Sequence, residues 1–220
     1  MSIKVKIGSA RIDERKKISG GKAGDQTKFE VSTQDFYQHP KGWLVLRPTA
    51  FAKEIAKNMK DACKNDNIGY SQIDRYSLMR ALEKVDSFKE VKKCNCDCSS
   101  LVRECVRKAF KKYVPDFNTE SERFVLEKGG FVKVLTNCKI PDQLKEGDIL
   151  VTKKRGHTAI VVSVEKDKKA KKENIDDIVK RVISGEFKTG QERYKLLKEA
   201  GYDPVAVQKK VNEVIANAKS

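Results

Sequence analysis

The chain has 220 residues and a formal net charge of +16, from 47 Lys and Arg residues against 31 Asp and Glu residues. Hydrophobic residues make up 39% of it, which is enough for a packed core and excludes disorder along its whole length. No apolar run reaches the roughly 18–20 residues that a helix needs to cross a bilayer, so the composition excludes an integral membrane protein.

The excess of positive charge favours a polyanionic partner: nucleic acid, anionic lipid or an acidic cell wall. Nucleic-acid binders normally add a recognition motif or an aromatic stacking surface, and neither is recognisable in a chain with 7% aromatic residues. We therefore expect no nucleic-acid partner and no membrane insertion. The N-terminus lacks an apolar segment of signal-peptide length, so we expect no signal peptide, and reduced thiols, as in a cytosol, for the six cysteines.

Strand patterns recur along the first three quarters of the chain. Apolar and polar residues alternate at 3–7 and again at 29–31, and GWLVLRP at 42–48 is a strand that ends at a proline. Two β-rich runs of strand length follow much later, EGDILVT at 146–152 and HTAIVVSV at 157–164.

Helical spacing fills the interval between these strands, so the pattern predicts an α+β fold. Apolar residues repeat with helical period at 49–63, where Thr49 is the expected N-cap. A second helix is predicted at 71–85, with a capping box that starts at Ser71. The most regular pattern runs from 98 to 113 and is wide enough for a helix packed against a core.

The composition changes at KDKKAKKEN, which is rich in lysine and predicts a solvated linker. Beyond it, three short helical patterns predict a small three-helix bundle, with a capping box at Thr189 and Glu192 and an N-cap at Asp203. The predicted organisation is a catalytic domain at 1–165, a linker at 166–173 and a helical domain at 174–220.

Cys98 is the strongest candidate for a nucleophile. It stands next to Asp97 at the start of the most regular helix, where backbone N–H groups and the helix dipole should lower the pKa of the thiol. The chain has two histidines, and His157 begins a β-rich run. A cysteine at a helix N-terminus that faces a histidine on a neighbouring strand is a papain-like arrangement.

Other readings of the cysteines stay open at this point. Cys94, Cys96 and Cys98 could form a metal site, although zinc sites favour wider gaps and a second ligand pair. The remaining cysteines are predicted to fill the core, namely Cys63, Cys105 and Cys138. His39, in QHPKGW, is predicted to be a loop histidine.

The motifs DCSSLV, GDILV and GHTAIVV resemble those of NlpC-type papain-like cysteine peptidases, which are related to CHAP amidases. The resemblance implies a papain-like domain in which a central helix packs on an antiparallel sheet. It makes Cys98 the nucleophile, with its own backbone N–H in the oxyanion hole, and His157 the general base. Asp25 and Ser99 become candidates for an oxyanion or orienting role. No metal or organic cofactor is implied.

Three further segments are similar to those of phage endolysins that carry such a domain: SGGKAGDQTKFEVSTQDFY, GWLVLRP and NIGYSQIDRYSL. This similarity spans roughly residues 8–164. It makes Gln26, Tyr70 and Gln72 candidates for the substrate cleft.

The C-terminal unit resembles the Cpl-seven-like cell-wall-binding repeat of phage lysozymes over about 40 residues. The resemblance implies that this unit binds peptidoglycan and makes four residues candidate ligands: Arg193, Tyr202, Asp203 and Asn212. The chain departs from the repeat where W-G-N-G is usual, because it has Phe187, Lys188, Thr189 and Gly190.

Together these resemblances predict an endolysin that cleaves an amide bond in the peptidoglycan of a Gram-positive bacterium, in the stem peptide or at the muramoyl-L-alanine linkage. It would be stored in the cytoplasm of the host and reach the wall at lysis. The alternative is a non-catalytic basic protein that binds cell wall or nucleic acid and carries a cysteine-rich metal site.

Overall fold

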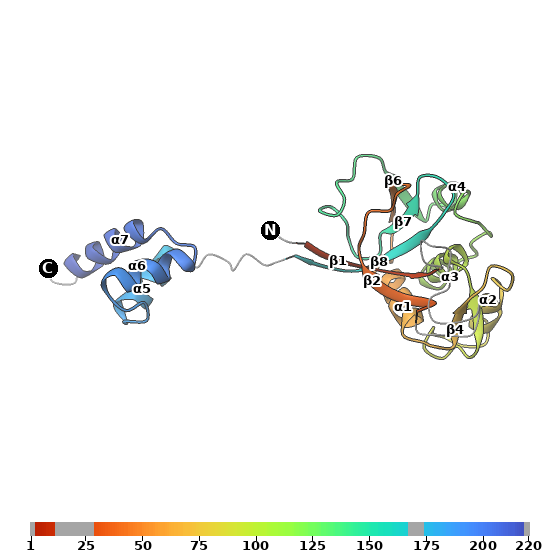
Figure 1. The fold of residues 1–220 in the computed structure, drawn as a ribbon, viewed down its shortest axis with the longest axis horizontal. Coiled ribbons are helices and arrows are strands. Elements are labelled where there is room, and N and C mark those ends of the chain that lie inside the picture. Colours follow the sequence, from red (N-terminus) through yellow and green to blue (C-terminus); the bar gives the residue numbers. More distant parts are fainter. Residues whose placement is uncertain (1–2, 12–28, 167–173, 218–220) are drawn as a thin grey trace. The chain divides into compact units, whose positions relative to one another are not determined.

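The computed structural model describes residues 3–11, 29–166 and 174–217. The chain divides into two compact units, residues 2–166 and 167–220 (Figure 1). In the described ranges no helix combines the length and the apolarity needed to span a bilayer.

The first unit is built on an antiparallel sheet with the strand order β2-β1-β8-β7-β3-β6. The strands are β1 (Ile3–Ala10), β2 (Val31–Asp35), β3 (Trp43–Pro48), β6 (Val132–Leu135), β7 (Ile149–Thr152) and β8 (Thr158–Lys166). All five predicted strand patterns therefore fall on or beside strands of one sheet.

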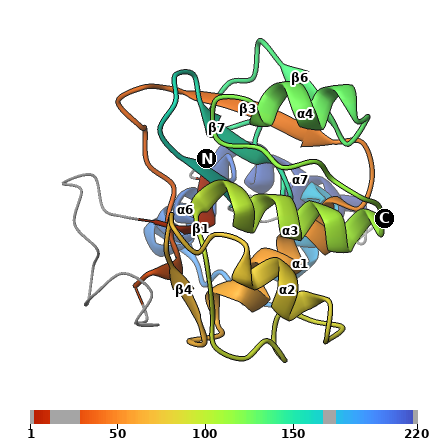
Figure 2. The same ribbon diagram turned by 90° about the vertical axis from the view of Figure 1, so that its right-hand side faces the viewer.

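Helices and a second, small sheet complete this unit. The helices are α1 (Ala52–Cys63), α2 (Ser77–Leu82), α3 (Cys98–Phe110) and α4 (Glu122–Lys128), and β4 (Ile68–Tyr70) pairs in parallel with β5 (Cys94–Cys96). Figure 2 shows α3 running across the middle of the unit, with α1 and α2 on one side of it and α4 on the other. The mixed α+β class and the antiparallel sheet are as predicted.

The predicted starts of the first two helices are wrong. Thr49 does not cap α1, because its hydroxyl donates to the Gly130 carbonyl at 2.8 Å, and the residue before the helix is Phe51 in a left-handed conformation. Ser71 accepts from the Asp74 amide at 3.1 Å, but this bond closes a turn, and α2 begins only at Ser77.

Helix α3 joins the sheet to the helices. Its apolar face is buried, as its spacing predicts, and packs against α1 and β8. The predicted end at 113 is wrong, because Lys111 adopts a left-handed conformation that ends the helix at Phe110 and leaves Tyr113 exposed. The buried residues of this face are Leu101, Val102, Cys105, Val106 and Ala109. Because neighbouring elements pack against this buried face, the position of α3 is fixed, and so is that of the residues at its N-terminus.

The described part of the second unit holds α5 (Ile175–Ile183), α6 (Gly190–Glu199) and α7 (Pro204–Asn217), which share one hydrophobic cluster. Asp203 caps α7 by accepting from the Val205 amide at 2.9 Å, as predicted. The predicted capping box at Thr189 is wrong, because its side chain makes no cap hydrogen bond and Glu192 pairs with Lys188 instead. Phe187 belongs to the buried cluster, so the aromatic residue at this departure from the repeat packs inside the unit.

Candidate active site

The N-terminus of α3 is held by a complete capping box. Asp97 Oδ1 accepts from the Ser100 backbone N–H at 2.6 Å, and Ser100 Oγ accepts from the Asp97 backbone N–H at 2.8 Å. This exchange satisfies two donors at the helix start. It leaves Cys98 as the first residue of the helix.

The surroundings of the Cys98 thiol shift its pKa in opposite directions. Backbone hydrogen bonds from Thr158 and Ser99 lower its pKa, while burial and the carboxyl groups of Asp97 and Glu122 raise it. Burial is the largest of these effects, and the net pKa is about 12. The prediction of a lowered pKa is therefore wrong: in the absence of substrate the thiol is protonated at neutral pH.

His157 immediately precedes β8, whose first residue, Thr158, reaches the Cys98 sulfur through its backbone amide. The structure thus brings the chain segment of His157 to the N-terminus of α3. The imidazole Nε2 lies 3.3 Å from the hydroxyl of Ser9, which is buried in β1. The sequence carries no signal for Ser9, because only the pairing of β1 with β8 brings it to the histidine.

Tyr70 and Gln72 lie together at the end of β4. Gln72 Nε2 donates to the Tyr70 hydroxyl at 2.9 Å. Burial, followed by the charge of Cys98, raises the pKa of the Tyr70 phenol above its ordinary value. The parallel pairing of β4 with β5 sets Tyr70 opposite Cys96, two residues before the predicted nucleophile.

Ser99 is tied into the cap of α3. Its hydroxyl donates to Asp97 Oδ1 at 3.0 Å and accepts from Arg75 at 3.1 Å. The other predicted site residues of this unit, Asp25 and Gln26, lie outside the described residues, and their roles stay predictions.

Arg75 organises the loop in front of α3. Its guanidinium donates to Asp97 at 2.8 Å, to Asp116 at 2.8 Å and to the Phe117 carbonyl at 2.6 Å. Burial opposes ionisation of Asp116, but the hydrogen bond from the Tyr76 hydroxyl, followed by the charges of Arg75 and Arg103, lowers the pKa of that carboxyl group. Sequence reasoning missed Arg75, because nothing in its own segment indicates partners that lie 22, 41 and 42 residues further along the chain.

Both histidines of the chain lie against Trp43. The Trp43 ring centroid is 5.1 Å from that of His39 and 6.2 Å from that of His157. His39 also accepts from the Lys41 backbone N–H at 3.1 Å, which agrees with the predicted loop position. The indole therefore forms part of the wall beside the candidate general base.

The cysteines of β5 do not converge on a metal site. Cys94 and Cys96 are buried, and the Cys96 thiol donates to the Gly69 carbonyl at 3.7 Å. Across the ranges that the structure describes, no three His, Cys, Asp or Glu side chains are grouped so that they could hold a metal ion. Cys105 is buried in the core and Cys63 packs against it, as predicted.

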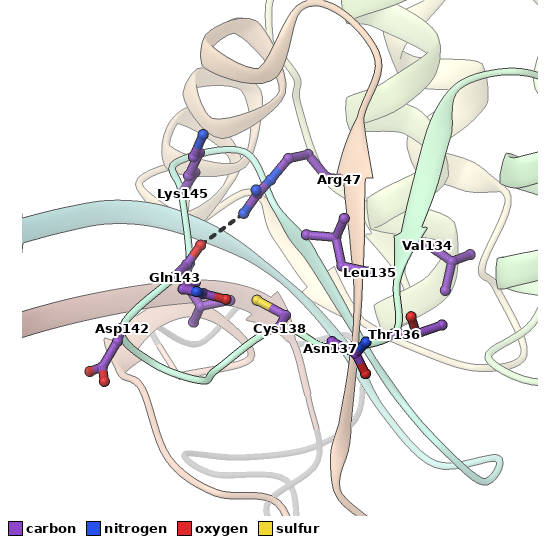
Figure 3. A pocket seen from close by; sticks show the side chains of 10 residues that line it. Arg47, Val134, Leu135, Thr136, Asn137, Cys138, Asp142, Gln143 and Lys145 are labelled. Carbon is purple, nitrogen blue, oxygen red and sulfur yellow. Dashed lines mark hydrogen bonds between the residues drawn. The ribbon is translucent and has the colours of Figure 1, made fainter.

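Cys138 is half-buried and lines a cavity of about 610 Å³, together with residues that include Arg47 and Lys145 (Figure 3). Arg47 is already engaged there, because it donates to both carboxylate oxygens of Asp148 at 2.8 and 2.7 Å and to the Gln143 carbonyl at 2.8 Å. None of the lining residues belongs to the Cys98 site, so this cavity is separate from it.

The second unit has its own cavity of about 500 Å³ between α6 and α7. Arg193 and Asn212 line it and are linked through Gln208, which accepts from Arg193 at 3.0 Å and donates to Asn212 at 2.9 Å. Tyr202 packs against the buried cluster and Asp203 caps α7, so neither lines this cavity. A ligand role for these two residues stays a prediction. Tyr194 lines the cavity with an exposed ring and was missed.

Comparison with protein families identifies the family to which the larger unit belongs. Residues 7–170 match the family described as "Endolysin-like domain". This match covers most of the chain, so the chain belongs to the endolysin-like domain family. Residues 176–215 match the CW_7 repeat. The coarse prediction, an endolysin followed by a repeat of phage lysozymes, is confirmed; the NlpC-type subclass stays a prediction.

The chain is also similar to the lysozyme of Streptococcus phage Cp-7, with 42% identity over 59 residues. This alignment covers 25% of the chain and 17% of that lysozyme. No solved structure matches the chain.

Proposed function

We propose that this protein is a peptidoglycan hydrolase of the endolysin type that uses Cys98 as its nucleophile. The observation that carries the proposal is the position of Cys98: it starts a buried helix and contacts the backbone amide next to His157. Membership of the endolysin-like domain family supports the substrate class. The bond cleaved is an amide, in the stem peptide or at the muramoyl-L-alanine linkage.

The raised pKa of Cys98 determines how the first step proceeds. Because the thiol is protonated before substrate binds, His157 must take its proton as the sulfur attacks the carbonyl carbon. The attack gives a tetrahedral intermediate, whose oxyanion is stabilised by backbone N–H groups at the start of α3. His157 then returns the proton to the leaving amine, and water hydrolyses the thioester to release the enzyme.

The packing of α3 on an antiparallel sheet that contains the histidine segment supports a papain-like fold for the first unit. Tyr70 pairs in register with Cys96, two residues before the nucleophile, and Gln72 donates to the Tyr70 hydroxyl, which supports a place for both residues in the substrate cleft. This arrangement supports a nucleophile on a helix and a general base on the segment that leads into the sheet.

The second unit is proposed to hold the enzyme on the peptidoglycan of a Gram-positive wall. The match to the CW_7 repeat and the similarity to a streptococcal phage lysozyme support this role. Arg193, Gln208 and Asn212 would supply hydrogen bonds in the cavity, and the exposed Tyr194 ring would contact a sugar face. We also propose that the protein waits in the host cytoplasm and reaches the wall at lysis.

The test is loss of turbidity of Gram-positive cell walls. Cys98→Ala should reduce clearing by at least about a thousandfold, since a nucleophile acts as a unit with its base, while sedimentation with walls is unchanged. Cys138→Ala is the matched control, because that thiol lies in the separate cavity. Clearing by Cys98→Ala at the wild-type rate would contradict the mechanism. Wall binding without clearing by the wild type would favour the non-catalytic alternative.

A further inference from the structure

Glu122 is a buried carboxylic acid that the mechanism above does not use. The residue is 0% exposed, at the first position of α4. Its Oε1 accepts from the Thr158 hydroxyl at 2.7 Å. Its Oε2 is also buried, and no residue in the described ranges is within hydrogen-bonding distance of it. A buried oxygen without a partner is costly, so its presence calls for an explanation.

Thr158 connects this carboxyl group to the Cys98 site. Its side chain holds Glu122, while its backbone amide donates to the Cys98 sulfur. Thr158 is itself fully buried and directly follows His157 in the chain. One residue therefore joins Glu122 to the nucleophile and, by chain connectivity, to the candidate base.

Glu122 and the Cys98 site also interact electrostatically. Two ionisable groups face Glu122: Asp97, at the cap of α3, and Cys98. The Tyr70 phenol, at the end of β4, interacts electrostatically with the same thiol. Burial, with a smaller contribution from Asp97, raises the pKa of Glu122 to about 8. At neutral pH the carboxyl group is therefore largely uncharged, and a thiolate can form beside it at lower cost than beside a carboxylate.

We propose that Glu122 is a positioning residue of the cysteine site, which acts through Thr158 on the Cys98 sulfur and, as an uncharged acid, adds no negative charge of its own beside the nascent thiolate. This inference rests on the proposed function, because it assigns Glu122 to the site of that reaction.

The first experiment removes the link. Thr158→Val keeps the shape of the side chain but loses the hydroxyl group, and we expect wall clearing to fall about tenfold, as one lost hydrogen bond to a positioned group implies. Thr158→Ser restores the hydroxyl and should return clearing to within about twofold of the wild type. Clearing by Thr158→Val at the wild-type rate would overturn the proposal, as would equal losses in the Val and Ser variants.

The second experiment removes the charge. Glu122→Gln keeps the acceptor for Thr158 but cannot ionise. The measurement is the rate of Cys98 alkylation by iodoacetamide between about pH 6 and about pH 10, with the modified residue identified by mass spectrometry. Above about pH 8 the variant should react at least about threefold faster than the wild type, because no carboxylate opposes its thiolate. The control is Glu127→Gln, an exposed residue of the same helix, whose profile should follow the wild type.

Coincident pH profiles of Glu122→Gln, Glu127→Gln and the wild type would contradict the proposal. If one variant fails to fold, as judged by near-UV circular dichroism, the other experiment decides alone. Alkylation reports on Cys98 whether or not this thiol cleaves the wall. Clearing by Cys98→Ala would thus refute the proposed function and leave the alkylation result standing.

Discussion

Cys98 shows how a local rule and a tertiary environment can oppose each other at one residue. The rule that a helix N-terminus favours a thiolate is sound, and the backbone N–H groups of Ser99 and Thr158 do act in that direction. Burial and two neighbouring carboxyl groups outweigh them. The enzyme we propose would therefore not store a reactive thiolate, but would create one when substrate and base are both in place.

The raised pKa of Glu122 makes a prediction about stability. The pKa is about 8 in the fold against an ordinary value of 4.5, so folding favours the protonated carboxyl group. Its contribution to stability is fully present below about pH 4.5 and is lost as the pH rises to about 8. The melting temperature of Glu122→Gln relative to the wild type should consequently increase, by a few degrees, from about pH 5 to about pH 9.

Thermal unfolding of both proteins at the two pH values measures this difference, with Glu127→Gln as the control for a change of charge at an exposed site. A difference between Glu122→Gln and the wild type that does not change with pH would show that Glu122 does not titrate in this range.

At the scale of elements, the cap of α3 is the most consequential local structure. Asp97→Ala removes the acceptor for the Ser100 amide and the partner of Arg75, and should destabilise the unit by about 1–2 kcal/mol or more. Asp97→Asn should cost less, because its amide oxygen can still accept from that N–H group. Urea unfolding of the two variants measures this. Equal losses would show that the charge of Asp97, and not its cap, stabilises the helix.

The longer elements could be predicted from the sequence because their periodicity reflects burial. Helix α3 and the strands β7 and β8 have enough apolar residues to define a face. The capping interactions were predicted less well. The pattern at Ser71 has the right residues for a capping box, but it closes a turn before α2. The strand Cys94–Cys96 has only three residues, which is too short for any period to be recognised.

The motif GDILV has a structural meaning that the sequence alone does not disclose. Gly147 has a φ of +90°, and a Cβ there would lie 2.3 Å from the Ala52 carbonyl oxygen, so only glycine lets β7 approach the start of α1. Asp148 is buried and paired with Arg47 at 2.7 Å. The sequence likewise could not predict that three residues lie near the candidate site, because only strand pairing and helix packing bring them there: Ser9, Arg75 and Glu122.

At the scale of the whole molecule, our proposal assigns catalysis and wall attachment to separate units, so they should respond to different substitutions. Arg193→Ala removes one of the two cations that line the cavity between α6 and α7, and with it the partner of Gln208. It should weaken sedimentation of the full chain with cell walls by about tenfold, as the loss of one charged hydrogen-bonding group implies. Alkylation of Cys98 should be unchanged.

Lys195→Ala is the matched control, because it removes one positive charge from an exposed position of the same helix outside that cavity. If both variants lose wall binding to the same extent, general attraction between a basic protein and an anionic wall explains the binding, and the cavity does not.

The chain has a single tryptophan, and it stands beside both of its histidines. Protonated imidazole quenches indole fluorescence, so the emission of Trp43 is a built-in optical probe of the two rings. Replacing His39 with Gln would leave His157 as the remaining titrating quencher. The ionisation of the candidate base could then be followed by light alone, in the unlabelled protein and without any substrate.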